Sequence, residues 1–208
     1  YLISSNPRSS GYENEASVYI DDFEGTQNKI DLRDVNSWKL ASIPDGYKGY
    51  DFGRNNIKSG YNRAKLSWYS IDPIFYSYRR PNEISSDEVS KNSTRRIYVD
   101  EIFPELDLFQ GESRSQTTFD LSFYPDEKGP YNNNTTDEFL SDKKNNWAAV
   151  TKSINTTNFK KANVEYIQFW MLDDFGDYDS NEFEIGEIVF HLGNISEDIL
   201  NDGKKQYE

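Results

Sequence analysis

The stretch YIQFWMLDDFGDYDSNEFEIGEIVFHLGNISEDILNDGKKQYE, residues 166–208, decides the fold class that the sequence predicts. Two apolar segments rich in β-favouring residues, 164–172 and 183–192, flank an acidic loop, and this pattern is typical of paired strands. In the second segment the apolar positions change parity at Gly186-Glu187. One extra residue there would restore the inward face, so the pattern predicts a β-bulge.

The residues after this strand pair predict one short helix. Asn194 is a favourable N-cap residue, and Glu197 three positions later completes a pattern like a capping box. Gly203 stands where a left-handed residue would end the helix.

Working back toward the N-terminus, further short segments predict strands. The cleanest alternation lies in residues 117–124, where Phe119, Leu121 and Phe123 share one face. The polar stretches 80–94 and 125–146 read as loops. The other predicted strands are residues 17–23, 37–42, 63–70, 95–103 and 147–154.

Eight or nine short strands with long loops and almost no helix predict an all-β fold, an antiparallel β-sandwich of the jelly-roll kind. We expect residues 1–16 to form a flexible lead-in and residues 17–193 to form the sandwich. Residues 194–208 are expected to hold the short helix and the start of a linker. We also expect both ends to be boundaries within a longer protein.

Composition excludes several classes of function. The 208 residues include 23 basic and 36 acidic side chains, a net charge of −13, which repels phosphate backbones and argues against nucleic-acid binding. No apolar run approaches 18 residues, so the sequence predicts no membrane-spanning helix and no direct membrane insertion. The chain has no cysteine, which excludes disulfides and thiolate chemistry.

Five longer stretches carry a family resemblance. They are SVYIDDFEG (17–25), RAKLSWYSIDPIFY (63–76), RRIYVDEIFPELDLFQGESRSQTTFDLSFYPDEKGPYN (95–132), SINTTNFKKANVEYIQFWMLDDF (153–175) and FEIGEIVFHLGNISEDILNDGKKQYE (183–208). Together they resemble an internal region of the SprA/Sov family of gliding-motility and type IX secretion proteins.

The resemblance implies a non-catalytic structural or interaction domain within an outer-membrane β-barrel translocon that exports folded proteins. It implies a location at the cell outer membrane, and we expect the extracellular side rather than the periplasmic side. The implied partners are the remainder of the parent barrel, a PorV-type barrel partner, a plug protein and secreted cargo. The family has no attributed enzymatic activity.

A second, looser similarity concerns architecture. The opening VYIDDFEG and the ending YIQFWMLD…GEIVFH are similar to jelly rolls of the galactose-binding, carbohydrate-binding-module type. This similarity leaves a carbohydrate-binding module of a cell-surface protein as the alternative function. Trp38, Trp68 and Tyr69 are the candidate ligand or interface residues, because aromatic rings serve both sugar stacking and interface cores.

Acidic clusters suggest one candidate metal site. Carboxylate oxygens suit Ca²⁺, and in a jelly roll the first and last strands can lie close together. A structural calcium would be held by Asp21, Asp22, Asp173, Asp177 and Asp179, and the competing interpretation is a solvated acidic face.

Enzymatic alternatives have weaker support in the residues. Paired carboxylates also serve glycoside hydrolases, but any acidic protein offers such pairs. His191 is the only histidine, so a multi-histidine zinc site is excluded. Without a cysteine, a Cys–His pair is excluded as well.

Overall fold

The computed structural model describes residues 3–5, 18–20, 31–154, 169–172 and 186–204. Within this part the chain is rich in strands, and they pair into four small antiparallel sheets, β1–β2, β3–β8, β4–β7 and β5–β6. The strands are β1 (Ile3–Ser5), β2 (Val18–Ile20), β3 (Trp38–Leu40), β4 (Ala64–Tyr69), β5 (Ile97–Tyr98), β6 (Ser115–Gln116), β7 (Asp120–Lys128) and β8 (Val150–Lys152).

Helical segments in the described residues are short. The α-helices are α1 (Ser86–Ser90), α2 (Val99–Ile102) and α3 (Glu138–Ser141). The 3-10 turns are η1 (Val35–Ser37), η2 (Tyr50–Phe52), η3 (Ile57–Gly60), η4 (Pro73–Tyr76) and η5 (Lys143–Asn145). No helix in this part of the chain has the length and apolar character needed to cross a membrane.

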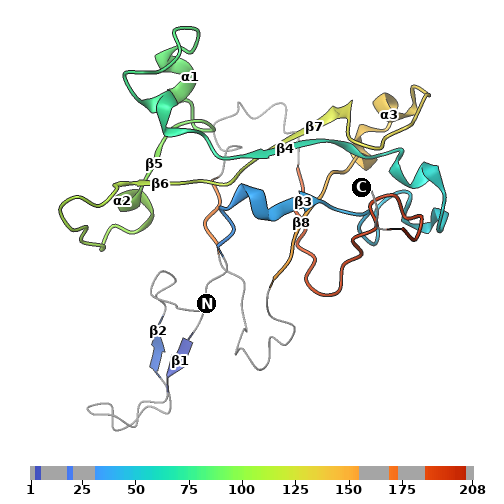
Figure 1. Cartoon of the computed structure of the whole chain (residues 1–208), viewed down its shortest axis with the longest axis horizontal. Helices are drawn as coiled ribbons and strands as arrows, with labels where there is room; N and C mark the ends of the chain where they lie inside the picture. Colours follow the sequence, from blue (N-terminus) through green and yellow to red (C-terminus); the bar gives the residue numbers. More distant parts are fainter. Residues whose placement is uncertain (1–2, 6–17, 21–30, 155–168, 173–185, 205–208) are drawn as a thin grey trace.

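Strands β4 and β7 form the longest paired element in the described residues, and we call this pair the ribbon (Figure 1). The β5–β6 pair and α2 extend from one end of it, and α3 and the C-terminal segment lie toward the other end. The two strands approach closely where the ribbon begins. A Cβ at Gly129 would lie 2.2 Å from the carbonyl oxygen of Ala64, so only glycine fits that position.

The prediction of a strand-rich fold is confirmed, and β2, β3, β4 and β8 fall inside predicted strands. Strand β7 begins at Asp120 and continues to Lys128, into the predicted loop. The predicted strand over residues 95–103 is wrong in its second half, where the chain turns into α2. The Glu101 carboxylate accepts the backbone N–H of Tyr98 (3.1 Å), which satisfies a donor at the helix start.

The polar stretch 80–94 is also not a pure loop, because it contains α1. The Ser85 hydroxyl accepts the N–H of Glu88, and the Glu88 carboxylate accepts the N–H of Ser85 (2.7 Å). This reciprocal capping box stabilises a one-turn helix. The signal was present in the sequence as Ser85-Ser86-Asp87-Glu88.

Two predictions concern the C-terminal residues, a short helix and a left-handed glycine. The predicted helix after Asn194 is wrong, because described residues 194–204 contain no helix. The Asp198 carboxylate instead accepts the N–H groups of Asp202 (3.1 Å) and Gly203 (2.6 Å), a local bond that competes with helix formation. Gly203 does adopt the expected left-handed conformation, with φ 78°.

The paired strands predicted in the same region are not seen in the residues described there. The described residues 169–172 and 186–192 have no strand assignment, and no bulge is seen at Gly186-Glu187 in this part of the chain. A strand needs a partner for its backbone groups, and periodicity alone does not supply one. The remaining residues of this predicted strand pair and its loop, 164–168 and 173–185, lie outside the described residues.

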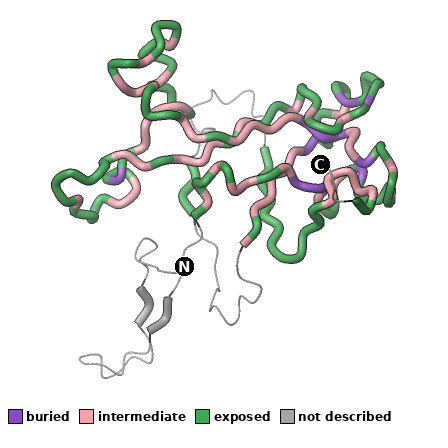
Figure 2. Tube along the Cα trace, in the orientation of Figure 1, coloured by how far each residue is buried: buried purple, intermediate pink, exposed green. Residues whose placement is uncertain are grey.

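Burial concentrates at the α3 end of the ribbon (Figure 2). The apolar part of this core is small, and the buried polar residues slightly outnumber the apolar ones there. The apolar members are Ala41, Ile43, Ala64, Phe139 and Trp147, and the polar members are Ser42, Ser59, Asn62, Arg63, Asn134 and Asn146. Buried polar groups need partners, so hydrogen bonds between segments carry much of the packing here.

Asn146 is the centre of that hydrogen-bond network. Its side-chain oxygen accepts a bond from the Asn62 amide (3.0 Å). Its own amide donates to the carbonyl oxygens of Pro125 and Phe139, both at 2.9 Å. One buried side chain thereby joins the chain before β4, strand β7 and helix α3.

Candidate functional site

One face of the β4–β7 ribbon is apolar. The register places Leu66 opposite Phe123 and Trp68 opposite Leu121, and directly opposite residues project to the same side of a sheet. Leu121 and Phe123 are 47% and 46% exposed, so the protein itself covers only about half of each. We call Leu66, Trp68, Leu121 and Phe123 the ribbon face.

The sequence forms this ribbon because its two segments alternate in step. KLSWY in β4 and DLSFY in β7 both place apolar side chains at every second position, the period of a pleated strand. The register confirms the predicted shared face for Leu121 and Phe123. Phe119, the third predicted member, precedes β7 and stacks on Trp38.

The opposite face of the ribbon is polar. Lys65 lies over the Tyr124 ring, with its ammonium 4.7 Å from the ring centroid, and pairs with Glu127 at 2.5 Å. The hydroxyls of Tyr69 and Ser122 are 2.9 Å apart and hydrogen-bonded. The ribbon is thus amphipathic, and its two sides offer different chemistry to a neighbour.

The three candidate aromatic residues do not form one platform. Trp38 stacks on Phe119, with ring centroids 5.0 Å apart, and its indole N–H donates to the carbonyl oxygen of Leu32 (2.8 Å). Trp68 and Tyr69 are consecutive in β4, so they point to opposite sides of the ribbon. Only Trp68 belongs to the ribbon face, and carbohydrate binding through these rings stays a prediction.

The candidate calcium ligands Asp21, Asp22, Asp173, Asp177 and Asp179 all lie outside the described residues. The calcium site therefore stays a prediction. Within the residues that the structure describes, no group of three or more His, Asp or Glu side chains is arranged to hold a metal ion.

Asp120 is the carboxyl group with the most unusual environment on the ribbon. Burial raises its pKa, although the Thr118 hydroxyl donates to it (2.8 Å) and opposes that rise. Tyr76 shares this region, and burial followed by the Asp120 charge raises its pKa, while Arg96 lies 4.8 Å above its ring. Alternation alone placed Asp120 on the polar face of the ribbon, and nothing in the sequence indicated its burial.

A hollow of about 340 Å³ opens near the C-terminal segment. Its charged lining is mixed, with Asp45 and Glu187 beside Lys48 and Lys144. Lys48 is already paired with Asp142 at 2.5 Å and with Glu138 at 3.3 Å. Opposite charges in one small hollow largely cancel, so this hollow selects neither anions nor cations.

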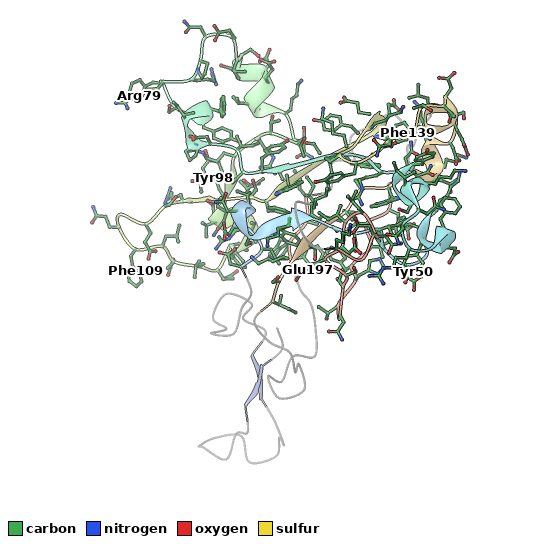
Figure 3. All side chains as sticks on the ribbon, turned by 45° about the vertical axis from the view of Figure 1, so that its right-hand side comes forward. Tyr50, Arg79, Tyr98, Phe109, Phe139 and Glu197 are labelled. Atoms are coloured by element: carbon green, nitrogen blue, oxygen red, sulfur yellow. The ribbon has the colours of Figure 1, made fainter. Side chains whose placement is uncertain are left out.

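Exposed apolar side chains also occur away from the ribbon, including the consecutive residues 169–172 and several between 188 and 195, and the rings of Phe169 and Phe190 lie 4.9 Å apart. Phe109 is 79% exposed and lies at the outer end of the loop between α2 and β6 (Figure 3). Single exposed apolar residues are common on protein surfaces. The ribbon face differs from these residues because its four side chains form two neighbouring cross-strand pairs of one sheet.

Comparisons with known proteins identify no family for this chain. No protein-family model matches the sequence, and no curated protein matches it. The resemblance to the SprA/Sov family therefore rests on the five stretches quoted above.

Proposed function

We propose that this chain is a non-catalytic docking segment of a protein-export translocon at the cell outer membrane, of the type IX secretion and gliding-motility kind. The ribbon face carries the proposal. It consists of four apolar side chains in two cross-strand pairs, with Leu121 and Phe123 about half exposed. The sequence resemblance to the SprA/Sov family supplies the cellular setting.

The occupant of the ribbon face is another part of the same parent polypeptide. A two-stranded ribbon is marginally stable in water unless another layer covers its apolar face. The covering layer must be present whenever the ribbon is folded. A permanently attached segment meets this requirement better than cargo that is bound only during export. A second copy fits poorly, because each chain carries a net charge of −13 and would repel another.

The same proposal explains where the second sheet of the predicted jelly-roll sandwich would come from. Sheets in a sandwich pack through apolar inner faces about 10 Å apart. The ribbon face is an inner face of that kind, and the polar side around Tyr69 and Tyr124 is the outer one. The second layer would come from the parent protein, with a PorV-type barrel, plug protein and cargo as more distant partners.

Photocrosslinking in the full-length parent protein tests the proposal. Benzoylphenylalanine replaces Phe123 on the ribbon face or, as the matched control, Tyr124 on the opposite face, where the side chain is 38% exposed. We expect position 123 to crosslink to another segment of the same polypeptide and position 124 to do so far less. Equal intrachain yields, or crosslinks from 123 only to separate proteins, would contradict the proposed occupant.

A further inference from the structure

Arg63 is a buried cation in an acidic protein. It immediately precedes β4 and is only 1% exposed. Its guanidinium carbon lies 4.6 Å from the centroid of the Trp147 ring. Its Nη1 donates to the carbonyl oxygen of Ala41 (2.7 Å) and its Nη2 to that of Ile199 (3.2 Å). Three distant parts of the chain therefore enclose this side chain.

The positive charge of Arg63 has no acidic partner in the described part of the chain. The ion pairs found there join other residues, and the Nε of Arg63 is buried without a hydrogen-bond acceptor. Burial lowers the pKa of Arg63 to about 10. Two neutral carbonyl oxygens do not neutralise a buried charge, and such a charge is costly until a counter-charge joins it.

Arg63 also borders a pocket of about 290 Å³. The pocket has apolar lining from Ile57, Ile199 and Leu200, and polar lining from Ser59, Tyr131 and Asn133. Asp202 borders it as well, but its carboxylate accepts the backbone N–H of Lys204 (2.7 Å). The pocket thus combines one buried cation, one carboxylate, hydrogen-bonding groups and an apolar wall.

We propose that this pocket binds a carboxylate attached to a small apolar group. The carboxylate supplies negative charge for the Arg63 guanidinium, whose Nη atoms donate to neutral carbonyl oxygens. The apolar group packs against Ile57, Ile199 and Leu200. Asp202 offsets part of the Arg63 charge, so the pocket suits a monoanion better than a phosphate dianion. A volume of about 290 Å³ admits a small ligand only.

Two sources share this chemistry, the last residue of a polypeptide and a free short-chain acid. Calorimetric titration of the 208-residue chain distinguishes them with the peptide acetyl-Gly-Gly-Leu and with 4-methylpentanoate. The C-terminal amide of the peptide is the neutral control. We expect at least one acid to bind and the amide to bind at least tenfold more weakly than the free-carboxylate peptide. A tighter peptide indicates a chain terminus, and tighter 4-methylpentanoate indicates a free acid.

Measurable and equal binding of peptide acid and peptide amide overturns the proposal. Absence of binding by both acids at 10 mM, a concentration about tenfold above a millimolar Kd, also overturns it. A variant then checks the location. Ile57→Trp narrows the pocket from a position that is 59% exposed, so the fold should tolerate it. Ile74→Trp, at an exposed isoleucine (42%) outside the pocket lining, is the matched control.

We expect Ile57→Trp to weaken carboxylate binding at least tenfold with an unchanged thermal unfolding midpoint. Ile74→Trp should bind like the wild type. If Ile57→Trp also binds like the wild type, the ligand does not occupy this pocket and the assignment is wrong. The result is independent of the ribbon-face proposal, because the two surfaces share no residue.

Discussion

Replacing Asn146 by aspartate tests the hydrogen-bond network that holds the small core together. Asn146→Asp keeps the shape of the side chain and the oxygen that accepts from Asn62. It removes the amide that donates to Pro125 and Phe139. Each buried carbonyl left without a donor costs about 1–3 kcal/mol. We therefore expect a loss of about 4 kcal/mol in the free energy of unfolding at pH 7.

The neighbouring variant Asn145→Asp is the matched control for Asn146→Asp. It makes the same change in charge at an exposed position, where only a hydrogen bond to Asp142 is lost, and it should cost less than about 1 kcal/mol. Urea unfolding followed by far-ultraviolet circular dichroism measures both. Equal losses for the two variants, or a loss under about 1 kcal/mol for Asn146→Asp, would refute the role assigned to the network.

The pH dependence gives a second readout for Asn146→Asp. Burial raises the pKa of the introduced carboxyl above its unfolded value. A group with a raised folded-state pKa stabilises the fold below the unfolded pKa, and that contribution is lost as pH rises through the folded value. The variant should therefore lie closer to the wild type at pH 3 than at pH 7. A deficit that does not change with pH would show that the introduced carboxyl is not buried.

Two further predictions concern packing and titration. Phe139 has no exposed surface, so Phe139→Ala should cost about 3–5 kcal/mol, while Phe109→Ala, at the exposed loop end, should cost under about 0.5 kcal/mol in the same urea assay. Burial raises the folded-state pKa of Asp120 above its ordinary value of 3.8. The free energy of unfolding of the wild type, compared with that of Asp120→Asn, should therefore fall as the pH rises from below 3.8 through the folded-state pKa. A relative stability that is flat with pH, or that rises, would show that Asp120 is not buried.

Local patterns predicted the elements whose partners also alternate. Strands β4 and β7 were predictable because both segments repeat apolar residues with period two, so pairing them buries one kind of side chain together. The segment 183–192 has equally strong apolar character, yet its described residues join no sheet. Alternation predicts which face a strand would bury. Whether a partner strand is present depends on the whole chain.

The sequence also predicted some features of the candidate site and not others. Leu121 and Phe123 were recognisable as one face from their alternation with polar neighbours. The separation of Trp68 from Tyr69 also follows from their adjacency, because neighbours in a strand point to opposite sides. The stacking of Trp38 on Phe119 joins residues 81 positions apart, and no local signal indicated it.

The amino-acid sequence by itself determined a strand-rich, acidic chain with an amphipathic ribbon, because strand periodicity and net charge are local or additive properties. Only the tertiary structure decided that Arg63, at the start of a predicted strand, is buried against Trp147 and capped by Ile199. Burial depends on which distant segments close over a residue. The physical reason is that pairing and desolvation arise from contacts across the chain, which a local pattern does not contain.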